Sequence, residues 1–256
     1  MFKLCVLAST SKGNATYVRI GSTSFLIDAG ISARKITKRL EEIGENVRAL
    51  DGIVVSHEHD DHIKGIKTLT KNYGLKCYLN YETYAKISKK TGPIDAEFID
   101  VGEEFVIQGV EILPYEIPHD GVNPLGFRIS YQGEHLLGYI CDCGFPSPYV
   151  LDGLRNVKIL IIEANHSFDM LLGSDYPEHL KYRLLGSKGH LSNWQAAEFI
   201  RVTQPSIAVL AHISEKNNTP ETALQEIQFI LDHENRSFGS FLVVYPPEER
   251  SALIQW

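Results

Sequence analysis

The stretch GIVVSHEHDDH, residues 52–62, decides the fold class of this chain. Its first four residues are an apolar run of strand length, and residues 57–62 carry three imidazoles and three carboxylates. Neutral imidazole nitrogen is a good ligand for zinc, manganese or iron, and carboxylate oxygen extends such a site toward harder ions. We expect a tight loop after a buried strand, in which His57 and His59 face one metal and Asp61 and His62 another. The alternative is a solvated polar loop.

Further candidate ligands follow later apolar runs of strand length. These residues are His119, Asp142 and His212. Taken singly, a histidine at a strand end is more often structural than a ligand, and an aspartate there can cap a turn. A two-metal site needs more ligands than one loop can supply, however, and these residues complete the number. We therefore predict two bound divalent ions.

Strand-like and helical patterns alternate from one end of the chain to the other, which predicts a single α/β domain over residues 1–256. Strands are expected at 2–7, 17–20, 24–28, 52–55, 75–79, 104–108, 110–117, 125–131, 135–141, 158–163, 206–211, 241–245 and 252–254. Helices are expected at 32–43, 63–73, 81–90, 177–185, 193–202 and 220–231. Ser192 to Gln195 form a capping-box pattern, and Thr219 precedes a proline that suits a first helical position.

Composition limits the class of protein and its partners. Hydrophobic residues make up 43% of the 256 residues and charged residues 22%, as in ordinary soluble proteins. No signal-peptide pattern and no apolar run long enough to span a bilayer is evident, and the four cysteines lack a CxxC pair, so we expect a cytoplasmic protein without a membrane partner. The net charge of −7 offers no global attraction to nucleic acid, so a nucleic-acid substrate must be bound locally.

The pattern His-x-His-x-Asp-His, followed by a lone histidine, an aspartate after a strand and a late histidine, resembles the metallo-β-lactamase superfamily. The resemblance implies a four-layer αββα sandwich with the metals at one edge. It also implies that His57, His59 and His119 bind one metal, that Asp61, His62 and His212 bind the other, and that Asp142 bridges them.

Residues 189–193, GHLSN, are similar to ribonuclease Z, in which the corresponding histidine assists phosphodiester cleavage. That similarity implies a catalytic role for His190 beside Asp61, either stabilising charge on the phosphate or protonating the leaving oxygen. The alternative for His190 is a helix-entry residue bonded to backbone.

Longer stretches at 7–17, 163–166, 176–177 and 212–220 look like the YycJ, WalJ or VicX family of ribonuclease Z-like nucleases. That family implies a metal-dependent 5′ to 3′ DNA exonuclease involved in DNA repair, with a hydroxide that bridges two divalent metals as the nucleophile. Cys141 and Cys143 depart from the family pattern, because hydroxyl residues are expected beside Asp142. This departure puts the oxidation sensitivity of the site in question and not its metal binding.

Several polar residues are candidate substrate contacts. The polar loop between the first two strands could hold a phosphate through side-chain and backbone donors, or could be a plain turn. The candidates are Ser9, Ser11, Lys12, Asn14, His166, Ser192, Asn217 and Asn218. Two other functions stay open: hydrolysis of a small thioester or cyclic phosphodiester, and a non-catalytic regulatory binding module.

Overall fold

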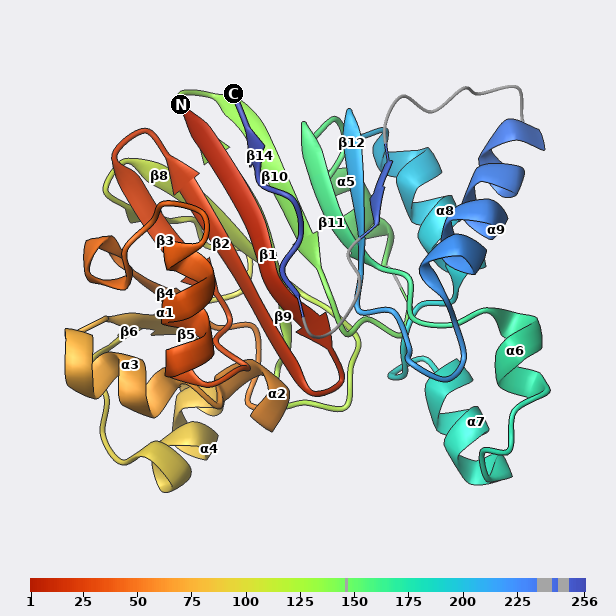
Figure 1. Cartoon of the computed structure of the whole chain (residues 1–256), viewed down its shortest axis with the longest axis horizontal. Coiled ribbons are helices and arrows are strands. Elements are labelled where there is room, and N and C mark those ends of the chain that lie inside the picture. The colour runs from red at the N-terminus through yellow and green to blue at the C-terminus, as the bar shows by residue number, and fades with distance from the viewer. Residues whose placement is uncertain (146, 234–240, 244–248) are drawn as a thin grey trace. The chain divides into compact units, whose positions relative to one another are not determined.

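Strands and helices are interspersed along the chain, with runs of consecutive strands at β1–β3 and β6–β10 (Figure 1). The structure is a computed structural model that describes residues 1–145, 147–233, 241–243 and 249–256. The described residues divide into two units, each with a mixed β-sheet. Unit 1 comprises residues 1–114, 121–125 and 249–256, and unit 2 comprises residues 115–120 and 126–243.

The elements that begin in unit 1 are β1 (Phe2–Thr10), β2 (Gly13–Ile20), β3 (Thr23–Ile27), α1 (Ala33–Glu41), the 3₁₀ helix η1 (Val47–Ala49), β4 (Gly52–Val54), α2 (Asp60–Ile63), α3 (Ile66–Tyr73), β5 (Cys77–Leu79), α4 (Tyr81–Thr91), β6 (Ala96–Phe98), β7 (Phe105–Ile107), β8 (Val110–Glu116) and β14 (Ile254–Gln255). The sheet of unit 1 has the order β14-β1-β2-β3-β4-β5-β6. Neighbours are antiparallel from β14 to β3 and parallel from β3 to β6.

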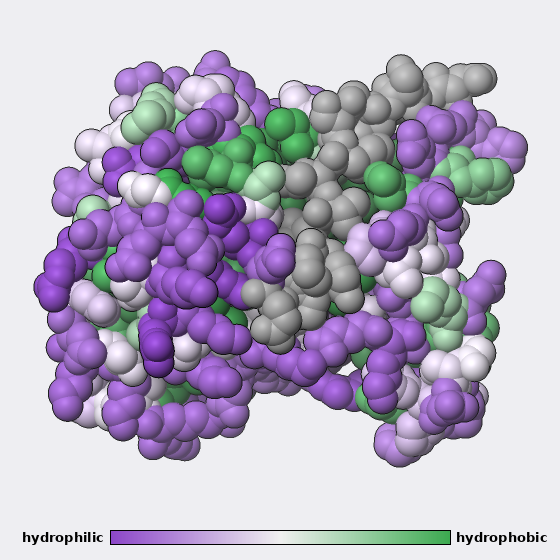
Figure 2. All heavy atoms as spheres, in the orientation of Figure 1, coloured by the Kyte–Doolittle hydropathy of each residue, from purple (hydrophilic) through white to green (hydrophobic). Residues whose placement is uncertain are grey.

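Helix α1 shows why the core of unit 1 forms where it does. Ala33, Ile36 and Leu40 are buried, and their helical spacing puts them on one face of α1. That face packs into a cluster with buried side chains of the sheet and of α3. Burying an Ile or Leu side chain stabilises a fold by about 1.5–3 kcal/mol, so this face fixes α1 on the sheet. In Figure 2, hydrophilic side chains cover most of the visible surface over the helices of unit 1.

The elements of unit 2 are β9 (Leu125–Tyr131), whose first residue belongs to unit 1, β10 (Glu134–Ile140), α5 (Pro148–Gly153), β11 (Ile159–Glu163), α6 (Phe168–Leu172), α7 (Glu178–Leu185), α8 (Asn193–Thr203), β12 (Ile207–Ala211), α9 (Pro220–His233) and β13 (Phe241–Val243). Its strands have the order β13-β12-β11-β10-β9. The pairs from β10 to β13 are parallel and β9 is antiparallel to β10. Helix α8 packs against β11 and α9.

Turn and cap residues account for several boundaries. Gln132 and Gly133 both have positive φ, which suits a two-residue hairpin between β9 and β10. The capping box at Ser192 is confirmed, because its hydroxyl accepts from the Gln195 amide while the Gln195 side chain accepts from the Ser192 amide. The Thr219 hydroxyl accepts from the Thr222 amide at the start of α9, as predicted.

Some elements differ from the prediction. Residues 60–62, expected in a loop, form the helical turn α2 together with Ile63, which was expected to begin the next helix. Asp60 and Asp61 occupy the first turn of α2, where negative side chains are favourable. β1 and β2 extend to Thr10 and from Gly13, so the expected polar loop shrinks to a two-residue turn. Strand β6 and helices α5 and α6 were not predicted because they are short, although a serine caps each of the two helices. Residues 244–245 of one expected strand lie outside the described residues.

None of the helices in the described part of the chain combines the length and apolar character that a bilayer-spanning helix needs.

Candidate metal centre

In unit 1, the histidine cluster begins directly after β4. His57 is fully buried, and its Nε2 lies 3.0 Å from Nδ1 of the half-buried His59. Two zinc–nitrogen bonds of about 2.0–2.1 Å that meet at a tetrahedral angle put their nitrogens about 3.3 Å apart. The spacing between these two ring nitrogens therefore fits a shared metal ion.

Helix α2 presents the other two ligand candidates of the cluster. Asp61 and His62 lie within its single turn, and the Asn14 amide nitrogen lies 3.3 Å from Asp61 Oδ2 and 3.0 Å from His62 Nε2. The lone pairs of Asp61 Oδ2 and His62 Nε2 thus both face the side-chain nitrogen of Asn14. A Cβ on Gly30 would meet the Asp61 carbonyl oxygen at 1.5 Å, so only glycine allows the chain after β3 to approach α2 this closely.

A buried carboxylate at the end of β3 orients this cluster. Asp28 Oδ2 lies 2.8 Å from His62 Nδ1 and accepts a hydrogen bond of 2.8 Å from the Ser56 hydroxyl. Asp28 Oδ1 also accepts from the Ser56 amide. A carboxylate on Nδ1 fixes the imidazole tautomer with its proton on Nδ1, which leaves the Nε2 lone pair for a metal.

In unit 2, ligand candidates from four separate segments converge. Asp142 follows β10, Glu163 ends β11, His190 precedes α8 and His212 follows β12. One candidate ligand atom from each of the four lies within 4.8 Å of the others. Asp142, Glu163 and His212 are buried, and the His190 side chain is 15% exposed. Two carboxylates and two imidazoles in this space form a donor set that suits a divalent transition metal.

Glu163 holds the two imidazoles of this group. Its Oε1 lies 2.5 Å from His190 Nδ1 and 2.9 Å from His212 Nδ1, and its Oε2 accepts from the Cys143 amide. Burial would raise the pKa of Glu163, but the charges and hydrogen bonds of His190 and His212 outweigh it and lower that pKa to about 2. The ionised carboxylate therefore fixes both rings through Nδ1.

The His119 ring is also oriented through a contact of its Nδ1 atom. Its Nδ1 lies 3.2 Å from the Gly189 carbonyl oxygen, and its ring centroid is 5.2 Å from that of His190. Burial lowers the pKa of His119, and a metal-binding imidazole must be neutral. The Nε2 atom lies 3.2 Å from the Asp120 carboxylate.

The backbone at three of these positions is left-handed. Asp28, Asp142 and His212 have φ values of 60°, 55° and 52°. Asp28 and His212 directly follow a strand, and Asp142 lies two residues after the end of β10. Non-glycine residues adopt this region at a cost of about 1–3 kcal/mol and cluster at functional sites when they do. The strain therefore supports a functional role for these strand ends.

The predicted substrate contacts lie in varied environments. Ser11 and Lys12 are exposed in the turn after β1, whereas Ser9 and Asn14 are buried. Asn217 and Asn218 are also buried and lie before α9, and Asn218 binds the Ala164 carbonyl and the Asn193 side chain. Ser192 caps α8. Substrate contact by all of these residues stays a prediction.

His166 is fully buried, and within the described residues neither of its ring nitrogens has a hydrogen-bond partner. Burial lowers its pKa to about 4, so the ring is neutral at physiological pH. Its contact with substrate also remains a prediction.

Three residues that orient the candidate ligands were missed at the level of sequence: Asp28, Ser56 and Glu163. Asp28 and Glu163 do carry a signal, because each is an acidic residue at the end of an apolar strand run. Asp28 and Glu163 do not stand at the spacing of a metal-ligand motif, because they bind the candidate ligand histidines and are not predicted ligands themselves.

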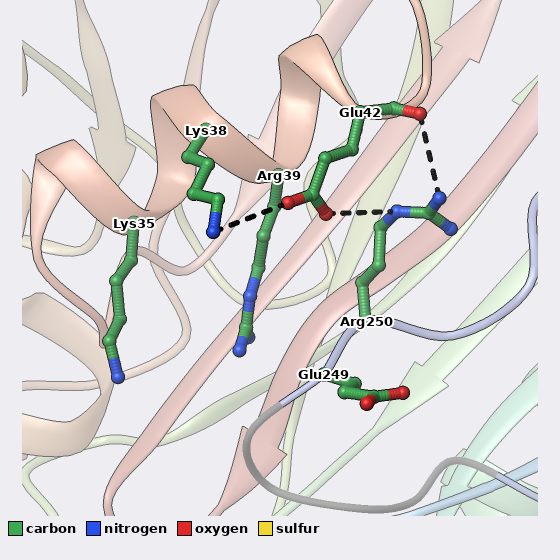
Figure 3. Close-up of a pocket in the computed structure, with 6 residues that line it drawn as sticks. All are labelled: Lys35, Lys38, Arg39, Glu42, Glu249 and Arg250. Carbon is green, nitrogen blue, oxygen red and sulfur yellow. Dashed lines mark hydrogen bonds and ion pairs between the residues drawn. The ribbon is translucent and has the colours of Figure 1, made fainter.

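A separate cavity of about 540 Å³ lies beside α1 in unit 1 (Figure 3). It gathers Lys35, Lys38, Arg39 and Arg250, but Glu42 already pairs with Lys38 and Arg250. Much of its positive charge is thus neutralised within the protein.

Comparison with known proteins identifies relatives of the whole chain. A family model described as the beta-lactamase superfamily domain matches residues 23–213. The chain is 34% identical over 230 residues to exodeoxyribonuclease WalJ of Streptococcus pneumoniae serotype 2, covering 87% of this chain and 85% of the relative. It is 30% identical over 251 residues to exodeoxyribonuclease YycJ of Bacillus anthracis, covering 96% and 95%.

Among solved structures, the metallo-β-lactamase fold protein YhfI of Bacillus subtilis is similar with a TM-score of 0.76 at 16% identity, covering both chains completely. This likeness shows the fold alone. The metallo-β-lactamase fold predicted from the sequence is confirmed.

Proposed function

The chain belongs to the beta-lactamase superfamily and, within it, to the family of WalJ and YycJ, and on that premise we propose that it is a metal-dependent phosphodiesterase that degrades DNA from 5′ to 3′. The observation that supports this most is the group in unit 2, where the buried Glu163 carboxylate holds His190 and His212 beside Asp142. Such a group provides metal ligands and a fixed imidazole for proton transfer.

We propose the ligand set that the sequence resemblance implies. His57, His59 and His119 would hold one ion, Asp61, His62 and His212 the other, and Asp142 both. The nitrogen and carboxylate donors described in each unit fit zinc, manganese or iron. Two such ions, when bound, supply Lewis-acid polarisation of the phosphate and a hydroxide nucleophile at neutral pH.

Side chains of the protein orient the nucleophile and supply the proton for the leaving group. Asp61 and Asp142 orient the attacking hydroxide, whose oxygen forms a bond to phosphorus as the bond from phosphorus to the 3′ oxygen breaks. His190 is held through Nδ1 by Glu163, and although burial lowers the pKa of His190, the charges of Glu163 and Asp142 outweigh it and raise that pKa. The doubly protonated ring that this favours gives its Nε2 proton to the departing oxygen. Each turnover releases one 5′ nucleotide.

Duplex DNA labelled at either end tests this function. Protein supplied with Mn²⁺ should release a 5′ label as mononucleotide before a 3′ label, and a chelator such as EDTA should abolish release. Asp61→Asn should lose activity by about 100-fold or more, since it removes a ligand. Asp60→Asn is the matched control, because the neighbouring Asp60 is exposed and pairs with Lys90. Chelator-resistant degradation, or equal activity of both variants, would contradict the proposal.

We also propose a cytoplasmic location and a role in DNA repair, as the family resemblance implies. Cells that lack the protein should be more sensitive to DNA damage, and complementation with the Asp61→Asn variant should fail. Turnover of small thioesters or cyclic phosphodiesters without degradation of DNA would instead favour the alternative hydrolase.

A further inference from the structure

An aromatic cavity of about 450 Å³ lies in unit 2. Its lining residues lie at the ends of α6, α7 and α8, the helices labelled in Figure 1. Phe168 begins α6, Leu185 ends α7, and Ser192, Trp194 and Gln195 lie at the start of α8. This volume falls within the range of about 300–1,000 Å³ that is usual for small-ligand sites. No charged side chain is among these lining residues.

Both aromatic side chains of the cavity are more than half exposed. Trp194 is 61% exposed and Phe168 is 51% exposed. The other tryptophan, Trp256, lies in unit 1 and stacks on Phe2 with ring centroids 4.3 Å apart. Trp194 has no such stacked partner ring among the described residues. Exposed aromatic faces beside one another are a surface on which a flat ring can stack.

Hydrogen bonds fix the two segments that carry these rings. The Asn165 amide donates to the Leu191 carbonyl, and the Asn193 amide donates to the His166 carbonyl, both at 2.9 Å. Phe168 follows the first segment and Trp194 follows the second. The Gln195 side-chain oxygen accepts from the Ser192 amide and hydroxyl, which orients the Gln195 amide group at the cavity.

The cavity continues the segment that carries His190. Trp194 lies four residues after His190, so their Cα atoms are at most about 14 Å apart. His190 itself is held on Glu163 at the candidate metal-binding group of the same unit. His190 and Trp194 therefore belong to one short segment of unit 2.

From these observations we infer that Phe168 and Trp194 form a stacking subsite for a nucleobase of the DNA strand, near the bond to be cleaved. This subsite rests on the proposed nuclease function. Every nucleobase has a π-face that can stack on an aromatic ring. The cavity offers two aromatic rings and few polar groups, so it binds bases with little sequence preference. It deepens the proposed function by naming bases, besides phosphates, as groups that the protein recognises.

Fluorescence of Trp194 gives a direct test of base binding. The chain has two tryptophans, so Trp256→Phe leaves Trp194 as the single reporter. With EDTA present to prevent cleavage, a short single-stranded oligodeoxynucleotide should quench this fluorescence, and an oligomer of equal length with abasic sites should not. Equal quenching by both oligomers, or no change with either, would overturn the subsite.

Kinetics test the same subsite during turnover. Trp194→Ala should raise KM for single-stranded DNA by about tenfold, because one stacked base is lost, whereas Trp194→Phe should retain most of the affinity. Phe229→Ala is the matched control, because Phe229 is a 66% exposed ring on α9 outside the cavity, and its KM should not change. Equal KM values for the Trp194→Ala and Phe229→Ala variants would contradict the inference.

Two further outcomes separate this inference from the function on which it rests. If the unmodified protein degrades no DNA, the proposed function fails whatever the fluorescence shows. If DNA is degraded but sedimentation reveals a dimer that Trp194→Ala dissociates, the cavity binds a second copy of the chain and the base subsite is wrong.

Discussion

The two units bring candidate metal ligands together in opposite ways. In unit 1 they lie within six consecutive residues, His57 to His62, whereas in unit 2 Asp142 and His212 are 70 positions apart. Both units nevertheless place a buried carboxylate at a strand end, on Nδ1 of a histidine. Asp28 serves His62 at 2.8 Å, and Glu163 serves His212 at 2.9 Å.

The two carboxylates differ in how many separate chain segments each one binds. Asp28 binds one imidazole together with Ser56, which belongs to the same short segment as that imidazole. Glu163 binds two imidazoles and a backbone amide from three different segments. A local cluster keeps much of its geometry through chain connectivity, and a dispersed one depends on its shared carboxylate. Changes to Glu163 should therefore cost more than changes to Asp28.

The largest effect is expected for Glu163→Gln. The amide keeps the side-chain volume but loses the charge that holds His190 and His212, so metal affinity and DNA hydrolysis should each fall by about 100-fold. Titration with Zn²⁺ or Mn²⁺ and the nuclease assay measure the two effects. Glu226→Gln is the control, because Glu226 bonds Ser167 and Asn193 instead of an imidazole. If both variants bind metal equally well, Glu163 does not organise the ligands.

A smaller effect is expected for Asp28→Asn. The nearby Ser56 and the helical turn of α2 still constrain His62, so metal affinity should fall by about tenfold. The same titration measures it, with Asp51→Asn as the control, because Asp51 accepts a backbone amide of Ser24. If Asp28→Asn lowers metal affinity as much as Glu163→Gln does, the local cluster depends on its carboxylate as strongly as the dispersed cluster does, and the proposed difference is wrong.

The smallest effect is expected in unit 1 for Glu45→Gln, at a carboxylate that touches neither cluster. Partial burial raises the pKa of Glu45, but hydrogen bonds from Lys3 and Tyr17 and the charge of Arg19 outweigh it, and the net pKa is lowered. The stability that this carboxylate contributes is therefore present above its unfolded pKa and lost as the pH falls through its folded pKa.

Urea denaturation of Glu45→Gln should accordingly show a loss of about 0.5–1 kcal/mol at pH 7 that shrinks below about pH 4. Nuclease activity should not change. A loss that persists unchanged in acid would show that packing, and not charge, accounts for the effect.

The local features of the chain were predictable because neighbouring residues determine them. The density of ligand types at 57–62 predicted a metal cluster, alternating apolar runs predicted the strands, and Ser192 and Thr219 predicted two helix starts. The same reasoning misjudged residues 60–62, because a single helical turn leaves too little periodicity in the sequence to be recognised.

The sequence by itself determined the candidate ligand types, the order of the longer strands and helices, and the family. Only the tertiary structure decided which carboxylates hold the imidazoles, because Asp28 and Glu163 act on residues 34 and 49 positions away. It likewise decided that the chain turns left-handed at Asp142 and His212, and that Phe168 and Trp194 line one cavity. The physical reason is that these contacts depend on sheet register and helix packing, which sequence spacing does not encode.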